Sequence, residues 1–512
     1  MLSILKTATV VGIDACPVQV EVDVSFGLPH FVMVGLPDAS VRESRDRVRS
    51  AIRNSGFDYP PHRVTVNLAP ADLRKAGSAF DLPIALGILA ASRAIATAEI
   101  NDVLVLGELS LDGVIHPVRG VLPAAVCARR HRMRAMVLPS DNLAEAAVVQ
   151  GAALLPVRRL TDAVAALNGA AAPVRPAPAP RTGPSDDPDP DSDFADVQGQ
   201  GLARRALEIA AAGGHNALLV GPPGAGKTMM ARRLAGILPP LTFEEALEVT
   251  TIHSVAGLLP PGTGLVGRRP FRAPHHTISD VALVGGGSSP RPGEISLAHH
   301  GVLFLDEMPE FGRRVLDVLR QPLEEGHVRI ARAARTVSFP ARFMLVAAMN
   351  PCPCGFLGDA RRACRCTPAQ AHQYAGRVSG PLRDRIDLAV AVPATVPVVG
   401  RERPPGEASS LMRARVIAAR VRQAARNPRE RGSGTPRVNA RLDGRALRAL
   451  CRPDEAGSRL LQQACDRLAL TARAHDRVLR VARTIADLAG ADQIAREHVA
   501  EAMQFRGELV DW

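Results

Sequence analysis

The sequence predicts an α/β protein of several domains, in which a central parallel sheet lies between an N-terminal mixed α/β domain and a helical C-terminal domain. The chain has 512 residues, more than one hydrophobic core normally organises. Between residues 194 and 393 the apolar runs are continuous, which is typical of parallel strands that helices cover on both faces. Before this stretch, short β-type runs alternate with helical patterns, and after it the patterns are helical.

The N-terminal domain is expected to span residues 1–169. Its strands are predicted at 18–24, 31–34, 64–68, 103–106 and 135–138, and its helices at 40–55 and 79–92. Residues 170–193 are dense in proline and aspartate. Such a composition cannot bury a core, so this stretch is expected to be an extended linker.

The central domain is expected to span residues 194–393 and the C-terminal domain residues 394–512. In the central domain, the segment 242–245 has the pattern of a capping box and predicts the start of a helix. Helices of the C-terminal domain are predicted near 409–426, 443–451, 455–475 and 476–490.

A glycine-rich loop with the pattern GxxxxGK[ST] follows the apolar run 217–220. A phosphate cradle requires this order of strand, loop and helix, because glycines let successive backbone N–H groups converge on a triphosphate. The lysine supplies a charge at the β- and γ-phosphates, and the last hydroxyl can ligate Mg²⁺. The predicted nucleotide-binding residues are Gly221, Pro222, Pro223, Gly224, Ala225, Gly226, Lys227 and Thr228.

Polar side chains end the next apolar runs of the central domain. Asp306 and Glu307 follow the run 302–305, and the carboxyl end of a strand is where an open α/β sheet binds its ligand. Asp306 is predicted to hold Mg²⁺ and Glu307 to polarise the attacking water. Asn350 ends a later run, and its amide can orient water against a γ-phosphate. Together with Lys227, these are the catalytic residues that the motifs predict.

The order of these motifs resembles that of AAA+ ATPases. The stretches 270–279, 293–307 and 379–387 narrow the resemblance to the magnesium-chelatase-like branch, and within it to the bacterial competence-associated ComM/YifB type. Four further stretches are similar to that family, so nearly the whole chain is covered: 35–38, 45–52, 67–72 and 481–487. The resemblance implies a central AAA+ domain, a helical C-terminal lid, and a homo-oligomeric ring, usually a hexamer, that binds ATP and Mg²⁺ between subunits.

In such rings an arginine of one subunit reaches the γ-phosphate held by its neighbour. Arg385 matches the position of this arginine finger, with Arg383 as a weaker candidate. Arg473 resembles the second sensor arginine of related helicases, and Arg477 stays open as the alternative. Both roles follow from the resemblance alone.

The N-terminal domain resembles the Lon-protease domain, whose fold is related to the second domain of ribosomal protein S5, in the stretches 71–82, 107–114 and 117–120. Ser78 occupies roughly the position of the nucleophile. A Lon-type protease needs a lysine to activate this serine, and no lysine follows before Lys227. Arginine cannot replace it, because it does not lose its proton. The domain is therefore predicted to be inactive as a protease and to serve assembly or DNA contact.

Two further groups of residues invite a metal interpretation. Four thiolates, those of Cys352, Cys354, Cys364 and Cys366, can complete a tetrahedral Zn²⁺ shell, and the alternative is reduced thiols in an exposed loop. For the adjacent His275 and His276, a structural or pore-loop role is favoured over a ligand role, because neighbouring side chains of an extended segment point to opposite faces.

The charge of the chain is unevenly distributed. The formal net charge is +12, and residues 401–510 alone hold 22 arginines, no lysine and 13 acidic residues. This surplus suits a polyanionic partner, and a soluble basic helical domain without such a partner is the alternative. Aromatic residues make up only 3%, so contacts to nucleic acid would be to phosphates rather than through base stacking.

No apolar stretch reaches the roughly 18 residues that a membrane span needs, and the N-terminus lacks the pattern of a secretory signal, so a cytoplasmic protein without membrane contact is expected. The motifs themselves predict an ATPase. Resemblance and charge together predict a ring motor on single-stranded or branched DNA, active as a helicase or branch-migration factor in homologous recombination and natural transformation. The alternatives are a chelatase-type motor subunit and a protein-remodelling ATPase.

Overall fold

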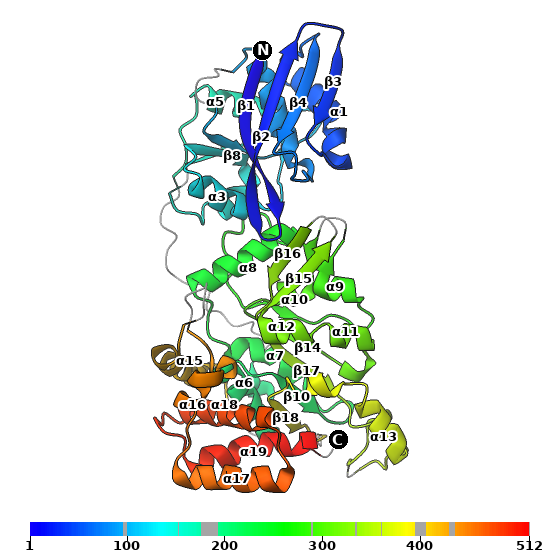
Figure 1. The fold of residues 1–512 in the computed structure, drawn as a ribbon, viewed down its shortest axis with the longest axis vertical. Coiled ribbons are helices and arrows are strands. Elements are labelled where there is room, and N and C mark those ends of the chain that lie inside the picture. The colour runs from blue at the N-terminus through cyan, green and yellow to red at the C-terminus, as the bar shows by residue number, and fades with distance from the viewer. Residues whose placement is uncertain are drawn as a thin grey trace.

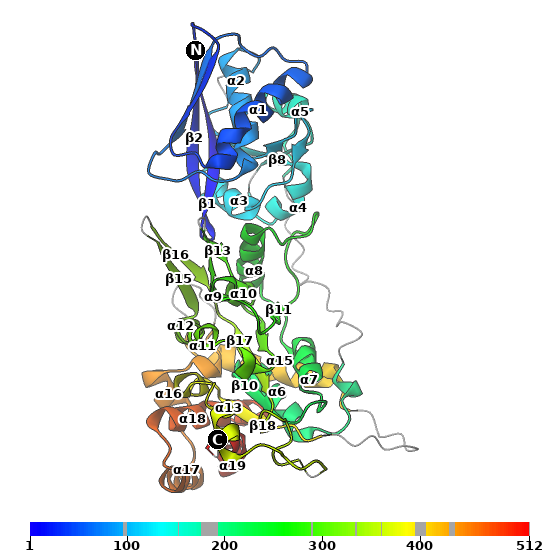
Figure 2. The same cartoon turned by 90° about the vertical axis from the view of Figure 1, so that its right-hand side faces the viewer.

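A computed structural model describes residues 1–95, 100–151, 153–175, 193–287, 290–332, 335–359, 361–394, 406–429 and 436–510. The described parts follow one another along a single long axis, with the N-terminal domain at one end and the C-terminal helices at the other (Figure 1). A view turned by 90° shows the same order (Figure 2). Most of the predicted linker, residues 176–192, lies outside the described part. No described helix is long and apolar enough to cross a membrane.

The N-terminal domain is built on a mixed seven-stranded sheet with the order β3-β4-β2-β1-β5-β8-β9. All five predicted strands are confirmed, and two more, at the start of the chain and after residue 150, were not predicted. The strands are β1 Leu2–Val11, β2 Asp14–Ser25, β3 His30–Val34, β4 Arg63–Ala69, β5 Val103–Val105, β8 Ala135–Pro139 and β9 Leu154–Val157. A small separate hairpin is formed by β6 Glu108–Leu109 and β7 Ile115–His116.

Both predicted helices of this domain are present, as α1 Ala39–Asn54 and α2 Asp81–Ala91. Asp38 caps α1, because its carboxylate accepts the N–H of Val41. Every residue of α2 is buried. Three further helices complete the domain: α3 Val121–Arg130, α4 Leu143–Ala146 and α5 Leu160–Leu167.

The central domain contains a five-stranded sheet with the order β11-β14-β17-β10-β18, and every pair in it is parallel. The continuous apolar runs therefore predicted the sheet type correctly. The strands are β10 Ala217–Val220, β11 Phe271–Arg272, β14 Val302–Leu305, β17 Met344–Met349 and β18 Leu388–Ala391. Alternate side chains of these strands belong to two different hydrophobic clusters, one on each face of the sheet.

Helices and two hairpins surround this sheet. The predicted capping box is confirmed, since Thr242 and Glu245 bond each other's backbone N–H groups at the start of α8. The helices are α6 Gly201–Gly213, α7 Lys227–Ile237, α8 Phe243–Ala256, α9 Asp280–Val284, α10 Glu294–Leu297, α11 Arg313–Asp317, α12 Arg320–Glu325, α13 Pro368–Ala375 and α14 Gly380–Arg383. The hairpins pair β12 Gly285–Gly286 with β13 Arg291–Pro292, and β15 His327–Arg332 with β16 Arg335–Pro340.

The C-terminal region is helical, as predicted, with α15 Ser409–Arg426, α16 Gly444–Leu450, α17 Glu455–Leu468, α18 Ala472–Leu488 and α19 Arg496–Val510. The predicted border between helices at 475 and 476 is wrong. α17 ends where Ala469 takes a left-handed conformation (φ 47°), and Thr471 then caps α18. These helices share one hydrophobic cluster with a face of the central sheet.

The described parts of the N-terminal and central domains touch at several places, among them the turn between β1 and β2 and the end of α8. The turn between β1 and β2 meets the hairpin β15–β16, where a Cβ on Gly12 would lie 2.9 Å from a methyl group of Val337. Beside it, the Ser254 hydroxyl at the end of α8 donates to the buried carboxylate of Glu145. Burial is the largest influence on Glu145 and raises its pKa.

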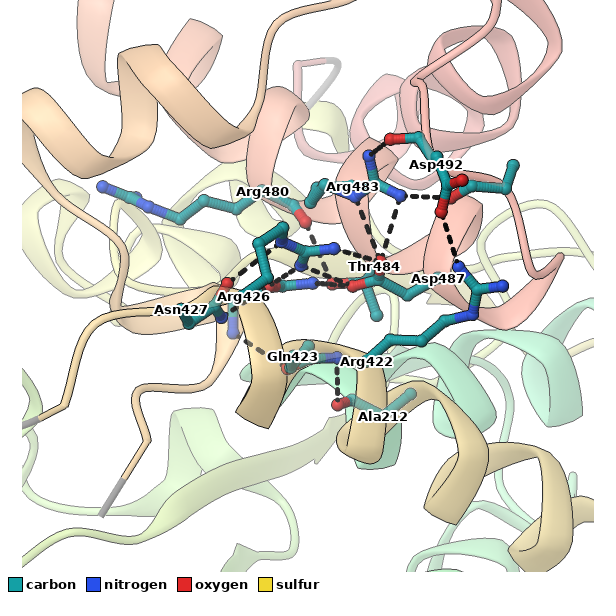
Figure 3. Close-up of polar contacts among 12 residues, drawn as sticks. Ala212, Arg422, Gln423, Arg426, Asn427, Arg480, Arg483, Thr484, Asp487 and Asp492 are labelled. Carbon is teal, nitrogen blue, oxygen red and sulfur yellow. Dashed lines mark hydrogen bonds and ion pairs between the residues drawn. The ribbon is translucent and has the colours of Figure 1, made fainter. Parts of the chain in front are cut away.

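A buried polar network joins the C-terminal helices (Figure 3). The carboxylate of Asp487, on α18, has no exposed surface. It accepts hydrogen bonds from Arg426 at 2.6 and 2.9 Å, from Arg483 at 3.1 Å and from Asn439 at 2.8 Å. The guanidinium groups of Arg426 and Arg483 therefore share one buried negative charge, and the ion pair between Arg426 and Asp487 links α15 to α18.

We expect the neutral variant Asp487→Asn to be strongly destabilised, because the buried Arg483 and the partly buried Arg426 would lose their counter-charge. Breaking such a pair costs about 3–5 kcal/mol, which corresponds to a fall in melting temperature of about 6 °C or more. Asp492→Asn is the matched control, because the Asp492 carboxylate is 95% exposed and pairs with Arg422 at the surface. Equal melting temperatures for the two variants would show that the network does not stabilise the fold.

Candidate active site

The glycine-rich loop has the backbone conformation that its sequence predicts. Gly224 and Gly226 have φ values of 77° and 88°, which side chains rarely allow. A Cβ on Gly221 would lie 2.1 Å from the carbonyl oxygen of Val392, so the loop starts in direct contact with the end of β18. The loop then leads straight into α7, whose first residue is Lys227. These residues fit a phosphate cradle at a helix N-terminus.

Lys227 lies inside this loop and is buried. Its ammonium group donates to the carbonyl oxygens of Gly221 at 2.6 Å and Pro222 at 3.0 Å, and to the amide oxygen of Asn350 at 3.1 Å. Burial lowers the pKa of Lys227, and the nearby carboxylates of Asp306 and Glu307 oppose this shift. The structure therefore brings Lys227 and Asn350 together, although 123 residues separate them.

Thr228 and Asp306 also meet. The Thr228 hydroxyl donates to the Asp306 carboxylate at 2.6 Å. A hydroxyl and a carboxylate oxygen are ligands that suit Mg²⁺. The adjacent strands β10, β14 and β17 end here, so Thr228, Asp306 and Asn350 all lie at the carboxyl edge of the sheet.

Glu307 takes a left-handed conformation with φ 51°, which is uncommon outside glycine and occurs at functional sites. Its carboxylate is 57% exposed, and the nearest ring nitrogen of His276 lies 3.7 Å away. His276 thus faces the residue that is predicted to polarise water. The sequence offered no signal for this contact, because the two residues belong to different segments.

The predicted arginines lie at the opposite edge of the sheet. Arg385 and Arg473 line one cleft of about 550 Å³, whose wall also includes Asn216 and Phe343, the residues that precede β10 and β17. The phosphate loop follows β10 at its other end. Four residues of strand β10 separate the two edges, which is about 13 Å at 3.3 Å per residue.

The two candidates for the second sensor arginine differ in their surroundings. Arg477 is buried and pairs with Asp384 at 3.6 Å. Arg473 is exposed in the cleft, and among the described residues it has neither a hydrogen bond nor an ion pair. Arg473 is therefore the one whose guanidinium is available to a ligand from outside the chain.

The four cysteines of the loop after Asn350 converge. Three sulfur pairs, 352–354, 352–364 and 354–364, lie 3.4, 3.6 and 3.6 Å apart, and all four Sγ atoms lie within 4.8 Å of one another. Tetrahedral zinc with Zn–S bonds of about 2.3 Å needs sulfur atoms about 3.8 Å apart. The cluster therefore fits a Zn²⁺ ion.

This cysteine loop, residues 352–366, packs on the phosphate loop. A Cβ on Gly355 would lie 2.6 Å from Cδ of Pro223. A cleft of about 370 Å³ runs between the two loops and is lined on one side by Pro222 and on the other by Leu357 and Arg361. The sequence placed the cysteines after Asn350, but only the structure shows this contact.

A second group of metal-ligand residues, Glu248, His299 and His300, does not fit a cation. The Nδ1 atom of His299 accepts the backbone N–H of Arg342 at 2.9 Å, so the proton of the neutral ring is on Nε2. This Nε2–H donates to Glu248 at 2.8 Å, and His300 donates to the same oxygen at 2.8 Å. The three residues form a strut that ties α8 to the segment before β14.

In the N-terminal domain, the Ser78 hydroxyl donates to the carboxylate of Glu108. The one lysine near it in sequence, Lys75, is fully buried, and its ammonium donates to the carbonyl oxygen of Pro70. The hydrogen-bond partner of the Ser78 hydroxyl is thus an acid rather than a lysine.

We expect purified protein to contain close to one equivalent of zinc per chain, because four thiolates at this spacing satisfy its coordination. Metal analysis after extensive dialysis tests this, with Cys364→Ser as the variant that should lose the metal. Cys465→Ser is the control, since Cys465 lies on α17 outside the cluster. Less than a tenth of an equivalent in the unmodified chain would exclude a zinc site.

Family models match most of the chain. The model described as magnesium chelatase, subunit ChlI, matches residues 193–398, its C-terminal model matches 406–506, and a model of subunit ChlI of Mg-chelatase matches 20–142. The chain is 44% identical over 507 residues to the uncharacterised protein YifB of Escherichia coli, covering 99% of this chain and 97% of YifB. It is 46% identical over 497 residues to the uncharacterised protein Rv2897c of Mycobacterium tuberculosis, covering 97% and 96%.

The chain is also 43% identical over 512 residues to the competence protein ComM of Haemophilus influenzae, covering 99% of this chain and 97% of ComM. This similarity extends through all three domains. The chain therefore belongs to the magnesium-chelatase-like ComM/YifB family of AAA+ proteins.

Proposed function

We propose that this protein hydrolyses ATP as a ring of identical subunits, six as the family resemblance implies, and uses the hydrolysis to move on DNA. The observation that carries the proposal is the separation of the site into two halves. The phosphate loop, Asp306 and Asn350 lie at one edge of the sheet, and Arg385 and Arg473 lie at the other. One chain cannot close its own site, but a neighbour that presents its arginine edge can.

Each residue of the first half has a chemical task. Lys227 exchanges a hydrogen bond to its own loop for one to the β- and γ-phosphates of the substrate. Thr228 and Asp306 would hold Mg²⁺, which neutralises charge on the phosphate oxygens. Glu307 accepts a proton from the attacking water, and the exposure of its carboxylate leaves room for that water. The amide of Asn350 orients the water or a γ-phosphate oxygen.

The second half comes from the neighbouring subunit. Arg385 and Arg473 carry two positive charges into one cleft, where they would meet the γ-phosphate as negative charge develops on it. Isolated monomers should therefore hydrolyse ATP poorly, although their phosphate loop is intact.

DNA is proposed as the partner because of the arginine surplus in the C-terminal region and because of the similarity to the competence protein ComM. Part of the arginine surplus stabilises the fold, since Arg415, Arg426 and Arg483 are ion-paired. Six arginines of the C-terminal region are exposed and have no partner among the described residues: Arg445, Arg448, Arg452, Arg467, Arg473 and Arg496. Three of them lie on or next to α16 and form a candidate contact for a phosphate backbone. The relative ComM is a competence protein, and this similarity supports a role in competence.

A chelatase-type motor subunit is the alternative that the family models favour, because their descriptions name a magnesium chelatase. A ring that remodels other proteins is a further alternative. Both would leave ATP hydrolysis insensitive to DNA.

The N-terminal domain, residues 1–169, is proposed to be a Lon-like domain without protease activity. The engagement of Ser78 with Glu108 supports this, because a carboxylate partner and the absence of a lysine leave the hydroxyl without the activation such proteases use. Peptide hydrolysis that disappears in Ser78→Ala would contradict it. A cytoplasmic location is proposed together with the DNA role.

We expect single-stranded or branched DNA to raise the rate of ATP hydrolysis at about 50 mM salt, and the effect to decline as salt rises, because phosphate contacts release counterions. Replacing Arg445, Arg448 and Arg452 by alanine should weaken DNA binding. It should also reduce the slope of log binding constant against log salt concentration by about 2, because each lost phosphate contact to a single strand accounts for about 0.7 of that slope.

The control for this variant replaces Gln462 and Gln463, exposed on the neighbouring helix α17, by alanine. It removes side chains without removing charge and should bind DNA as the unmodified chain does. If no DNA structure changes the rate of ATP hydrolysis at low salt, the proposal that the protein acts on DNA is wrong. A chelatase-type motor subunit or a protein-remodelling ATPase is then favoured.

A further inference from the structure

The guanidinium of Arg385 is not free in the cleft. It donates to the carboxylate of Glu324 and to the carbonyl oxygen of Pro381 in α14, the helix that ends two residues before Arg385. Its Nε atom is buried and has no hydrogen-bond partner in the described part of the chain. The side chain is 16% exposed, so in this arrangement it is folded back against its own subunit.

The backbone of Arg385 is anchored at the same time. Its carbonyl oxygen accepts from the amide of Asn216 at 2.7 Å, and the Asn216 oxygen accepts the N–H of Leu345 at 2.8 Å. Asn216 thus ties the segment to the starts of β10 and β17. Only the side chain of Arg385 can turn toward a neighbour, and its ion pair to Glu324 opposes that turn.

We propose that Glu324 is a positioning residue that holds the arginine finger Arg385 back until the cleft receives the triphosphate of a neighbouring subunit. This inference rests on the proposed function. The Glu324 carboxylate is 56% exposed, and a half-exposed ion pair is weak enough to break when a ligand with several negative charges arrives. The exposed Arg473 in the same cleft adds to the attraction for that ligand.

The place of Glu324 in the chain connects the finger to the hairpin β15–β16. Glu324 is the penultimate residue of α12, and Gly326 follows with φ 71° directly before β15. Gly326 also accepts the N–H of Ala341 at 2.9 Å, so the base of the hairpin is bound to the end of α12. A shift of this hairpin, which also contacts the N-terminal turn at Gly12, would move Glu324 and change its hold on Arg385.

The test compares Glu324→Gln with Glu325→Gln in the full-length chain. Glu325 is the matched control, because its carboxylate pairs with His327 instead. Glu324→Gln should raise kcat for ATP without DNA about two- to five-fold, which is the strength of such an ion pair, and leave KM unchanged. A loss of structure would lower kcat and the melting temperature instead.

A second readout does not depend on hydrolysis. Phenylglyoxal modifies accessible guanidinium groups, and mass spectrometry of the peptides reports each arginine separately. Arg385 should react at least twice as fast in Glu324→Gln as in the unmodified chain and in Glu325→Gln, with Arg467 as the internal reference. An unchanged Arg385 rate, or a kcat that is unchanged or lower, overturns this inference. An unmodified chain that hydrolyses no ATP overturns the proposed function instead.

Discussion

The parallel sheet of the central domain imposes the constraint on which the rest of the structure depends. All its strands run in one direction, so the loops that follow them gather at one edge and the segments that precede them gather at the other. The phosphate loop, Asp306 and Asn350 occupy the first edge, and Arg385 occupies the second. A buried sheet is rigid, so no local motion of one chain brings these groups together. Identical subunits that meet with unlike edges facing would join them, and such contacts form a ring when the rotation between subunits closes, as in the ring proposed here.

The C-terminal helices hold the residues at the second edge of the sheet in position. Helix α18 carries Arg473 at its start and Asp487 near its end, and the buried network around Asp487 locks it to α15. The fully buried His215, two residues before β10, bonds Thr484 of the same helix at 2.8 Å and lies 3.4 Å from Asp387, directly before β18. Buried contacts therefore fix the wall of the cleft, in which Arg385 is held by Glu324 while Arg473 has no partner among the described residues.

The residues that the structure brings together at the first edge could be named from the sequence, because each belongs to a local motif. The glycines and Lys227 are adjacent, and Asp306 and Asn350 each end a continuous apolar run that only a buried strand explains. The roles of Arg385 and Arg473 were inferred from the family resemblance alone, because a single arginine forms no motif that indicates a function. The pairing of Arg385 with Glu324 and the approach of His276 to Glu307 could not be predicted, because both depend on how distant segments pack. The border of α17 was missed because Ala469, not a glycine, takes the left-handed conformation.

The claim that two subunits share each site is tested most directly by mixing two variants. Arg385→Ala keeps the phosphate loop and Glu307 but lacks the finger, and Glu307→Gln keeps nucleotide binding and the finger but cannot activate water. Each variant alone should hydrolyse ATP at a small fraction of the unmodified rate. If the sites are composite, mixing them in equal amounts should restore up to about a quarter of that rate, because a quarter of randomly formed interfaces pair an intact Glu307 with an intact Arg385. A mixture no more active than its separate components would contradict the account.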